Sequence, residues 1–373
     1  MRGFARYTVE LFRAMQEVAG RELELLSFSP GPIAPEFREL LPITPVVFSA
    51  PREILWEQME LPRRLERHGI DIFHVTANRG LPLRRVCKYV LTCHDVIDRM
   101  PEYCDGETWR GALRKRYADF ISRRSADQYV TVSEFSKRDI CHFHGVPPER
   151  VTVIYNAAGD RFLQKLRADE IARVREKYGL PRQYFLFLAG FDKRKNADAL
   201  VEAYARLPHG FPPLVLAGAH NREFAKIFRR IAGLGLTDRI FCPDGLADDH
   251  LPAIYQGAIA LVHPSHYEGF GLQLVEAMAS GVPVLASRTT SLPEVLGGCG
   301  LLFNSDDPAS IAQQMERVAC DADVRETMAD QGRRRAREFS WRKSAEQMLA
   351  VYCDLLGRTA PLLNAEHVVG ERG

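Results

Sequence analysis

Short runs of aliphatic and β-branched residues alternate with longer segments of helical periodicity along most of the chain. A first series of expected strands covers Leu23–Phe28, Ile72–Val75, Tyr89–Cys93, Gln128–Val132 and Val151–Ile154. A second series covers Tyr184–Ala189, Leu214–Ala217, Arg239–Cys242, Ile259–Val262 and Val282–Ala286. This alternation is typical of doubly wound α/β domains, whose helices cover both faces of a mostly parallel sheet. The polar, helical segment 156–182 between the two series predicts a linker and the first helix of a second domain.

The start of the chain predicts a glycine turn at Gly3 that enters a helix with Tyr7, Leu11 and Ala14 or Met15 on one face. In a doubly wound domain such a turn normally follows a first, central strand, and none precedes it in this sequence. Either a strand lies upstream of the given start or another element takes its place. An unfilled central position would leave two neighbouring strands with unpaired edges.

Composition and charge narrow the class of protein. The 373 residues are enough for two domains, and 46% hydrophobic with 26% charged residues is typical of a globular protein. A formal net charge of +2 gives no reason to expect a nucleic-acid partner. The sequence shows neither a secretory leader nor an apolar run of the roughly 20 residues that span a bilayer. Its eight cysteines form no Cys-x-x-Cys pair, so we expect a cytoplasmic protein with reduced thiols.

One segment, 263–283, is the strongest candidate for chemistry. It places Glu268 and Glu276 around the turn Gly269–Gly271, which opens a helix between two expected buried strands. Free backbone N–H groups and the helix dipole at such a turn suit a phosphate, whereas carboxylates accept hydrogen bonds from hydroxyls. Ligands bind at strand-to-helix turns of this kind in parallel sheets. The segment therefore predicts a site for a nucleotide-sugar, with a surface loop and a solvated glutamate as the alternative.

A basic loop follows the strand Tyr184–Ala189 through Gly190. Its residues Lys193, Arg194 and Lys195 stand at the head of the next helix, where they could hold a pyrophosphate. A solvated basic loop is the alternative. No P-loop, Ser-His-Asp set or His-Glu-x-x-His motif is present, so neutralisation of a phosphate would fall to these cations and the helix dipole, without a metal.

Two strand ends of the first series also carry polar side chains. His94, followed by Asp95, could hydrogen-bond a sugar hydroxyl or help to move a proton, unless it is a histidine satisfied within the core. Ser133 is explained largely as the N-cap of the following helix. In the second series, amides and hydroxyls of the segment 289–298 could meet a phosphate or a base. Helix capping explains this segment almost as well, with Glu294 as a first-turn acid that complements the helix dipole.

Taken together, these residues resemble those of the family-4 retaining glycosyltransferases, which have the GT-B fold of two Rossmann-like domains facing across a cleft. The most specific motif is Glu268 and Glu276 with seven residues between them, within His-Pro-Ser-x-Tyr-Glu-Gly-Phe-Gly-Leu. Further similar blocks are Gly190–Asn196, Thr92–Asp95, Val132–Ser136, Val153–Asn156 and Ser291–Val295. The resemblance implies an acceptor-side domain, a donor-binding domain, a helix that crosses back to the first domain and a flexible tail. Their expected ranges are 1–165, 166–342, 343–358 and 359–373.

The resemblance also implies roles for individual residues. Glu276 would hydrogen-bond the ribose of the nucleotide, and Glu268 would hold hydroxyls of the donor sugar. Lys195 and Arg194 would neutralise the leaving diphosphate, and His94 would reach the donor sugar from the first domain. The expected catalytic residues are thus Glu268, Lys195 and His94.

Backbone amides of Phe270, Gly271 and Leu272, beside Gly269, would bind sugar and phosphate oxygens. Two positions depart from the family. Gly190 stands where the family often has arginine, and Gly3 with Phe4 keeps an altered form of the turn expected on the acceptor or phosphate side.

We therefore expect a metal-independent, retaining glycosyltransferase without a cofactor, acting in polysaccharide or lipopolysaccharide biosynthesis. The departing phosphate oxygen would take the proton of the acceptor, which would be a polysaccharide or a lipid-linked glycan. The loop Gly190–Asn196 resembles mannosyltransferase members and favours GDP-mannose. The alternatives are a catalytically impaired nucleotide-sugar binding protein and a nucleotide-sugar epimerase of the same fold. The basic helix 109–124 could touch an anionic membrane surface at the inner face, although a solvated helix face also explains it.

Overall fold

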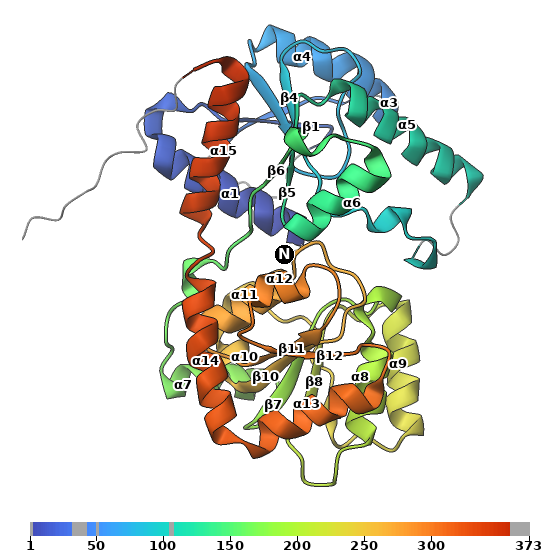
Figure 1. Ribbon diagram of the computed structural model, residues 1–373, viewed down its shortest axis with the longest axis vertical. Coiled ribbons are helices and arrows are strands. Elements are labelled where there is room, and N and C mark those ends of the chain that lie inside the picture. The colour runs from blue at the N-terminus through green and yellow to red at the C-terminus, as the bar shows by residue number, and fades with distance from the viewer. Residues whose placement is uncertain (1–2, 32–42, 50–51, 104–107, 359–373) are drawn as a thin grey trace, which may run out of the picture.

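The computed structural model describes residues 3–31, 43–49, 52–103 and 108–358, which form two α/β domains stacked end to end (Figure 1). The expected flexible tail at 359–373 lies outside the described residues.

The second domain is built on one continuous parallel sheet. Its strands are β7 (Tyr184–Leu188), β8 (Leu214–Ala217), β9 (Ile240–Phe241), β10 (Ala258–His263), β11 (Val284–Ser287) and β12 (Leu301–Phe303), in the order β12-β11-β10-β7-β8-β9. Five of the six were expected, whereas the edge strand β12 was missed because three residues give too short a pattern to recognise. Alternate residues of β7 face opposite ways: Tyr184 and Leu186 join one core, Phe185 and Phe187 the other. Both faces of this sheet are therefore apolar, as the continuous hydrophobic runs predicted.

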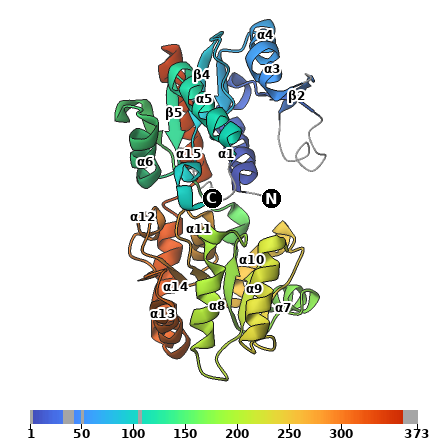
Figure 2. The ribbon, with the colours of Figure 1, turned by 90° about the vertical axis from the view of Figure 1, so that its right-hand side faces the viewer.

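Helices cover both faces of that sheet (Figure 2). The helices are α7 (Ala168–Lys177), α8 (Ala197–Ala205), α9 (Arg222–Gly233), α10 (Leu251–Gln256), α11 (Leu272–Ala279), α12 (Leu292–Leu296), α13 (Pro308–Cys320) and α14 (Ala322–Ala336). Helices α8, α9 and α13 contribute to one core, and α10, α11 and α12 to the other. The expected linker between the domains ends in α7.

The first domain has a divided sheet. Its strands are β1 (Leu26–Ser29), β2 (Thr44–Val47), β3 (Ile72–Val75), β4 (Lys88–Thr92), β5 (Gln128–Thr131) and β6 (Val151–Val153). Strands β3 to β6 form one parallel sheet in that order, while β1 pairs only with β2 among the described strands. The expectation of a single sheet of about five strands was wrong, because no described strand joins β1 to β3. Among the described strands, β1 and β3 each keep an unpaired edge, as expected for an unfilled central position.

The helices of the first domain are α1 (Gly3–Ala19), α3 (Glu53–Leu55), α4 (Leu61–Arg67), α5 (Trp109–Ser125) and α6 (Glu134–His144), with a π-helical turn at Trp56–Glu60. The turn expected at Gly3 and Phe4 is instead the first turn of α1. Tyr7, Leu11 and Met15 of this helix are buried, as the sequence predicted.

The last helix, α15 (Trp341–Leu356), returns from the second domain and packs beside α1 on the first (Figure 1). Its Ala345 and Met348 share a core with Tyr7 and Leu11 of α1. The same core continues through Trp341 to buried residues of α11 and α12. The returning helix therefore ties the two domains together where they meet.

Candidate active site

The basic loop and the Glu268 segment meet at one edge of the second sheet. They follow β7 and β10, which pair in parallel, so their carboxyl ends lie side by side. Nζ of Lys195 lies 2.5 Å from Oε1 of Glu268, and Arg194 reaches the other carboxylate oxygen at 3.3 Å. Lys195 is itself buried in the short turn after β7. The basic loop is therefore no solvated charge run, because two of its cations hold a buried carboxylate.

Glu268 has further polar partners. Nε2 of His263 lies 2.9 Å from Oε1 of Glu268, and the backbone N–H of Glu268 donates to the Thr290 hydroxyl. Burial alone would raise the pKa of the Glu268 carboxyl, but Lys195, His263 and Arg194 bring it well below its usual range. Burial lowers the pKa of His263, so the imidazole is neutral and donates its Nε2–H to the carboxylate. Glu268 is thus ionised, with two partners on Oε1 and one on Oε2, so Oε2 can still accept a hydroxyl and the group is not suited to donating a proton.

Helix α11 begins immediately after this carboxylate. Gly271 at its N-cap has a φ of 90°, and no side chain caps the helix. A β-branched or bulky residue is disfavoured at that angle, which explains the glycine. The amides of Phe270, Gly271 and Leu272 gather at this end, where a helix dipole favours an anion. The Phe270 side chain points elsewhere, into a core with Tyr155 and Phe339.

Glu276 lies one turn further along α11 and is only 2% exposed. The Tyr255 hydroxyl donates to its Oε2 at 3.0 Å, and Arg6 of the first domain pairs with its Oε1. Burial raises the pKa of this carboxyl, and Arg6 and Tyr255 oppose the rise.

His94 approaches the same region from the first domain. Its backbone carbonyl would lie 2.2 Å from a Cβ added at Gly269, so the two loops touch. Its ring packs against those of Phe4 and Tyr7, and its Nε2 lies 3.1 Å from the Thr76 carbonyl oxygen. A carbonyl only accepts, so Nε2 carries the hydrogen and Nδ1 is the acceptor of the ring. Burial lowers the pKa of His94 to about 4, which keeps the ring neutral.

Hydrogen bonds join the two domains around these residues. The hydroxyls of Ser133 and Ser136 donate to the Gly269 carbonyl at 2.6 and 3.0 Å. Ser133 also caps α6, as expected. The Glu294 carboxylate accepts from the backbone amides of Glu134 and Phe135, at 2.8 and 3.0 Å. Glu294, expected to complement the dipole of its own helix, thus complements that of α6 in the other domain.

The remaining expected residues lie around the edge of the candidate site. Gly190 is exposed at the end of β7, next to the turn that carries Lys195. Leu272 is the first residue of α11 and half-buried. Gly3 is exposed at the start of α1, while Phe4 contacts the site through His94.

His263 and Arg6 were not expected at the site, and Thr290 was expected only as part of the segment 289–298. His263 is the last residue of β10 and the first of the motif. Its place at the carboxyl end of a buried strand, where ligands bind in parallel sheets, was the signal that could have identified it. Thr290 has a φ of 53°, which is strained for a β-branched residue. This backbone angle is visible only in the structure. Arg6 had no sequence signal, because its partners are far away in the chain.

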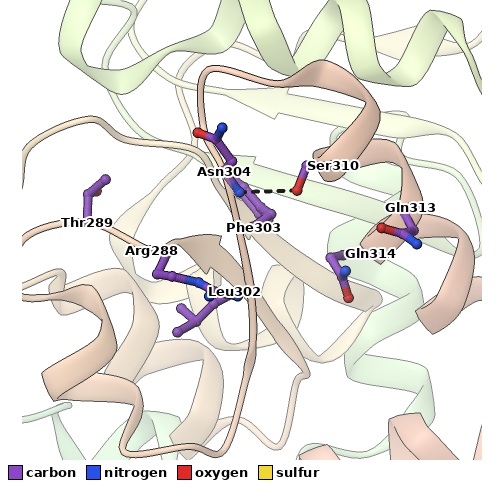
Figure 3. Close-up of a pocket in the computed structure, with 8 residues that line it drawn as sticks. All are labelled: Arg288, Thr289, Leu302, Phe303, Asn304, Ser310, Gln313 and Gln314. Atoms are coloured by element: carbon purple, nitrogen blue, oxygen red, sulfur yellow. Dashed lines mark hydrogen bonds between the residues drawn. The ribbon is translucent and has the colours of Figure 1, made fainter.

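A separate cavity of about 500 Å³ lies on the β12 side of the sheet (Figure 3). Arg288 and Thr289 after β11, Asn304 after β12, and Ser310 and Gln314 of α13 are among its lining residues. Thr289 also donates to the Ser265 carbonyl at 3.2 Å, so this loop borders the Glu268 region. None of the expected site residues lines the cavity.

Family models match both halves of the chain. Residues 1–158 match the model described as Glycosyltransferase Family 4, and residues 170–335 match Glycosyl transferases group 1.

Among curated relatives, O-antigen chain mannosyltransferase B of Escherichia coli is 30% identical and covers 94% of this chain and 95% of its own. The MMP alpha-(1->4)-mannosyltransferase of Mycolicibacterium hassiacum is 32% identical, and the match covers 79% of this chain and 73% of the relative. Serotype-specific mannosyltransferase WbdA of Escherichia coli is 31% identical over 78% of this chain, which spans only 36% of WbdA.

Solved structures support the same architecture. Anabaena Alr3699/HepE, in complex with UDP and glucose, has a TM-score of 0.77 and 20% identity, covering 94% of this chain and 95% of that one. WaaG, a glycosyltransferase involved in lipopolysaccharide biosynthesis, has a TM-score of 0.71 and 17% identity, and the match covers 95% of this chain and 96% of WaaG. The expected GT-B fold is thereby confirmed. From the two family models and the near full-length relative it follows that this chain belongs to the family-4 glycosyltransferases.

Proposed function

We propose that the chain is a retaining, metal-independent hexosyltransferase whose donor is a nucleotide-diphosphate sugar. The observation that carries the proposal is the cluster of Glu268, Lys195, Arg194 and His263 at the head of α11, opposite His94. It combines acceptors for sugar hydroxyls with cations and a helix N-terminus for a diphosphate. Electrostatic stabilisation of charge on a leaving group is a large contribution to catalysis in a site that excludes water.

In this reaction the acceptor hydroxyl attacks C1 of the donor sugar on the face from which the diphosphate leaves. The new bond joins the acceptor oxygen to C1, and the bond from C1 to the diphosphate oxygen breaks. The departing oxygen takes the proton of the acceptor hydroxyl, so the anomeric configuration is retained without a protein nucleophile. Lys195 and Arg194 would stabilise the charge that develops on the diphosphate, and Glu268 would orient the sugar.

The donor that we favour is GDP-mannose, with a polysaccharide or lipid-linked glycan as acceptor. Three of the relatives described above are named as mannosyltransferases, and one of them is an O-antigen chain enzyme. The loop that contains Lys195 resembles mannosyltransferase members in sequence as well.

The decisive test is titration calorimetry of the chain with GDP, UDP and ADP, followed by transfer assays with the sugars of the tightest-binding nucleotide. We expect GDP to bind most tightly and mannose to be transferred, with NMR showing retention at the anomeric carbon. Lys195→Met should lower kcat by about a hundredfold, the typical cost of losing one oxyanion partner. Lys193→Met, in the same turn but exposed, is the matched control and should keep wild-type kcat.

Other outcomes of this test select other functions. Binding without transfer or donor hydrolysis would favour a catalytically impaired binding protein, for which the divided first-domain sheet is the motivation. A sugar released with inverted configuration at C2 would favour an epimerase. Failure of all three nucleotides to bind would overturn the proposal.

We further propose that α5 holds the enzyme against an anionic membrane surface on the cytoplasmic side. Its exposed face carries Trp109, Leu113 and Phe120, which are 72%, 60% and 56% exposed and recur every one or two turns. Basic residues flank them on the same helix: Arg110, Arg114, Arg116, Arg123 and Arg124. The acid of this helix, Asp119, is buried. Exposed basic residues are attracted to anionic lipids, and exposed apolar side chains beside them can enter the headgroup region.

Figure 1 shows α5 projecting from the first domain. No helix in the described part of the chain is long and apolar enough to cross a membrane. Flotation with vesicles of phosphatidylglycerol and phosphatidylcholine tests the surface. Trp109→Ala combined with Phe120→Ala should release the protein from anionic vesicles, whereas Phe228→Ala, an equally exposed aromatic on α9, should not. Equal binding of all variants would contradict the proposal.

A further inference from the structure

One buried cation crosses from the first domain into the proposed donor site. Arg6, in the first turns of α1, is 9% exposed. Its Nη1 pairs with Oε1 of Glu276 on α11, and its Nη2 lies 3.1 Å from Oδ1 of Asp248 at the start of a short turn before α10. The guanidinium therefore connects the first helix of one domain with two acids of the other.

This arrangement places one partner on each oxygen of Glu276. Arg6 pairs with one carboxylate oxygen and the Tyr255 hydroxyl donates to the other, in surroundings that exclude water. A nucleotide ribose offers hydroxyl donors of the same kind as these two partners. Each carboxylate oxygen keeps a further lone pair, but Glu276 is only 2% exposed, so a ribose can reach it only where one of the two partners moves aside. Tyr255 is held within the core of the second domain. Arg6 is the partner that belongs to the opposite domain.

We propose that Arg6 is a latch that competes with the donor. In the donor-free enzyme it neutralises Glu276 and fastens α1 to the second domain, and the ribose displaces it when the donor binds. This inference rests on the proposed nucleotide-sugar function.

Asp248 makes the exchange feasible. Removing one partner of a buried ion pair normally leaves an uncompensated charge at high cost. Arg6 has a second acid at 3.1 Å whose side chain is 28% exposed, so it can keep an ion pair nearer to solvent after it leaves Glu276. The ribose hydroxyls would meanwhile satisfy the Glu276 carboxylate. Neither charge is then left unpaired at any stage.

Two substitutions with opposite expected signs test the latch. Arg6→Gln removes the competitor, so we expect guanosine and GDP to bind about three- to tenfold more tightly. Asp248→Asn removes the alternative partner of Arg6, so we expect the same ligands to bind about three- to tenfold more weakly. Arg6→Lys keeps the charge but offers a single nitrogen to the two acids, so it should bind these ligands with an affinity between those of the wild type and Arg6→Gln. Thermal unfolding of each variant checks that the fold is intact. Weaker binding by Arg6→Gln, or a shift of both variants in the same direction, would overturn the inference.

Amide hydrogen exchange provides a second readout that does not require tight nucleotide binding. In the donor-free enzyme, Arg6→Gln should exchange faster than wild type at residues 3–9, because α1 loses its anchor. Adding GDP to the wild type should speed exchange in the same residues, and it should change nothing there in Arg6→Gln. Protection of residues 3–9 by GDP would make Arg6 a direct donor contact and overturn the latch. If no nucleotide binds the wild type, the proposed function fails, and the donor-free comparison alone decides whether Arg6 fastens the domains.

Discussion

The two domains of this glycosyltransferase have related folds but contribute different chemistry. The second domain has a continuous six-stranded sheet, and a cluster of buried charged groups stands at its edge. The first domain has a divided sheet, and the groups it brings to the same place are a neutral imidazole, serine hydroxyls and helix amides. It also brings a few charged groups: Arg6 pairs with Glu276, Asp95 interacts with Arg194, and the Asp139 carboxylate accepts from the Tyr267 hydroxyl.

This difference follows from what each kind of group requires. A buried carboxylate such as Glu268 is tolerated only when its partners are fixed within hydrogen-bonding distance. Neighbouring strands of one sheet, β7 and β10, fix Lys195 and Glu268 in that way. Neutral hydroxyls and amides lose less when a domain moves away, because water can replace their partners. The closely paired charges around Glu268 therefore stand on one domain, whereas hydrogen bonds that water could replace make up much of the contact between the domains.

The largest effect is expected at the charged cluster. Glu268→Gln keeps the shape of the side chain but leaves Lys195 and Arg194 without their shared carboxylate. We expect transfer to fall by about a thousandfold, a loss of roughly 4 kcal/mol in transition-state stabilisation. Steady-state kinetics measures this, with Glu316→Gln on the exposed face of α13 as the control. Near wild-type activity would show that the cluster is a structural ion pair only.

A second large effect is expected where the domains touch. A methyl group at Gly269 would collide with the His94 carbonyl oxygen, 2.2 Å away. The three atoms nearest to this methyl group all belong to His94 and Asp95 of the other domain. Gly269→Ala should therefore lower kcat/KM by about a hundredfold, roughly 2.7 kcal/mol, by holding the domains apart. Its melting temperature should change little. Gly233→Ala, where nothing lies within 4 Å, is the control. Unchanged kinetics would mean that turnover does not require this contact.

Acid should weaken the first domain more steeply than the second, where His263 is the one described histidine whose pKa is lowered. Burial is the main cause that lowers the pKa of His74 to about 3, and those of His94 and His144 to about 4. In the unfolded chain these imidazoles take up protons near pH 6.5, so between about pH 6.5 and 4 the unfolded state binds more protons. The free energy of unfolding therefore falls with pH, by about 1.4 kcal/mol per pH unit for each group.

Urea unfolding of the first domain at pH 7, 6 and 5 measures this slope. His144 is remote from the site. His144→Gln should therefore reduce the pH dependence of the free energy of unfolding by about one third, the contribution of one of the three histidines. A first domain whose stability does not depend on pH in this range would contradict the burial of these three rings.

The smallest effect is expected at Glu294. Glu294→Gln keeps one oxygen acceptor for the α6 amides but removes the charge that complements the α6 dipole, typically worth up to about 1 kcal/mol. We expect kcat/KM to fall about three- to fivefold, and the fall to diminish at high salt. An effect as large as that of Glu268→Gln would place Glu294 among the groups that contact substrate, and would remove the distinction between the two domains.

The second domain was the part of the molecule that the sequence predicted well. Continuous apolar runs identified five of its strands, and parallel pairing then required the loops with Lys195 and Glu268 to share one edge. The first domain was predicted less well. Thr44–Val47 is short and isolated, and whether β1 and β3 belong to one sheet depends on pairing that no local pattern encodes.

By itself the sequence determined the fold class, the family and the residues that could bind a sugar and a diphosphate, because strand periodicity and strand-end motifs are local in the chain. Only the tertiary structure decided how those residues are paired. It showed that Glu268 is an ionised group held by Lys195, that His94 is neutral, and that Glu276 is occupied by Arg6. The physical reason is that protonation and pairing depend on burial and on neighbours brought together by folding. Arg6 and Glu276, 270 positions apart, meet only when the two domains come together.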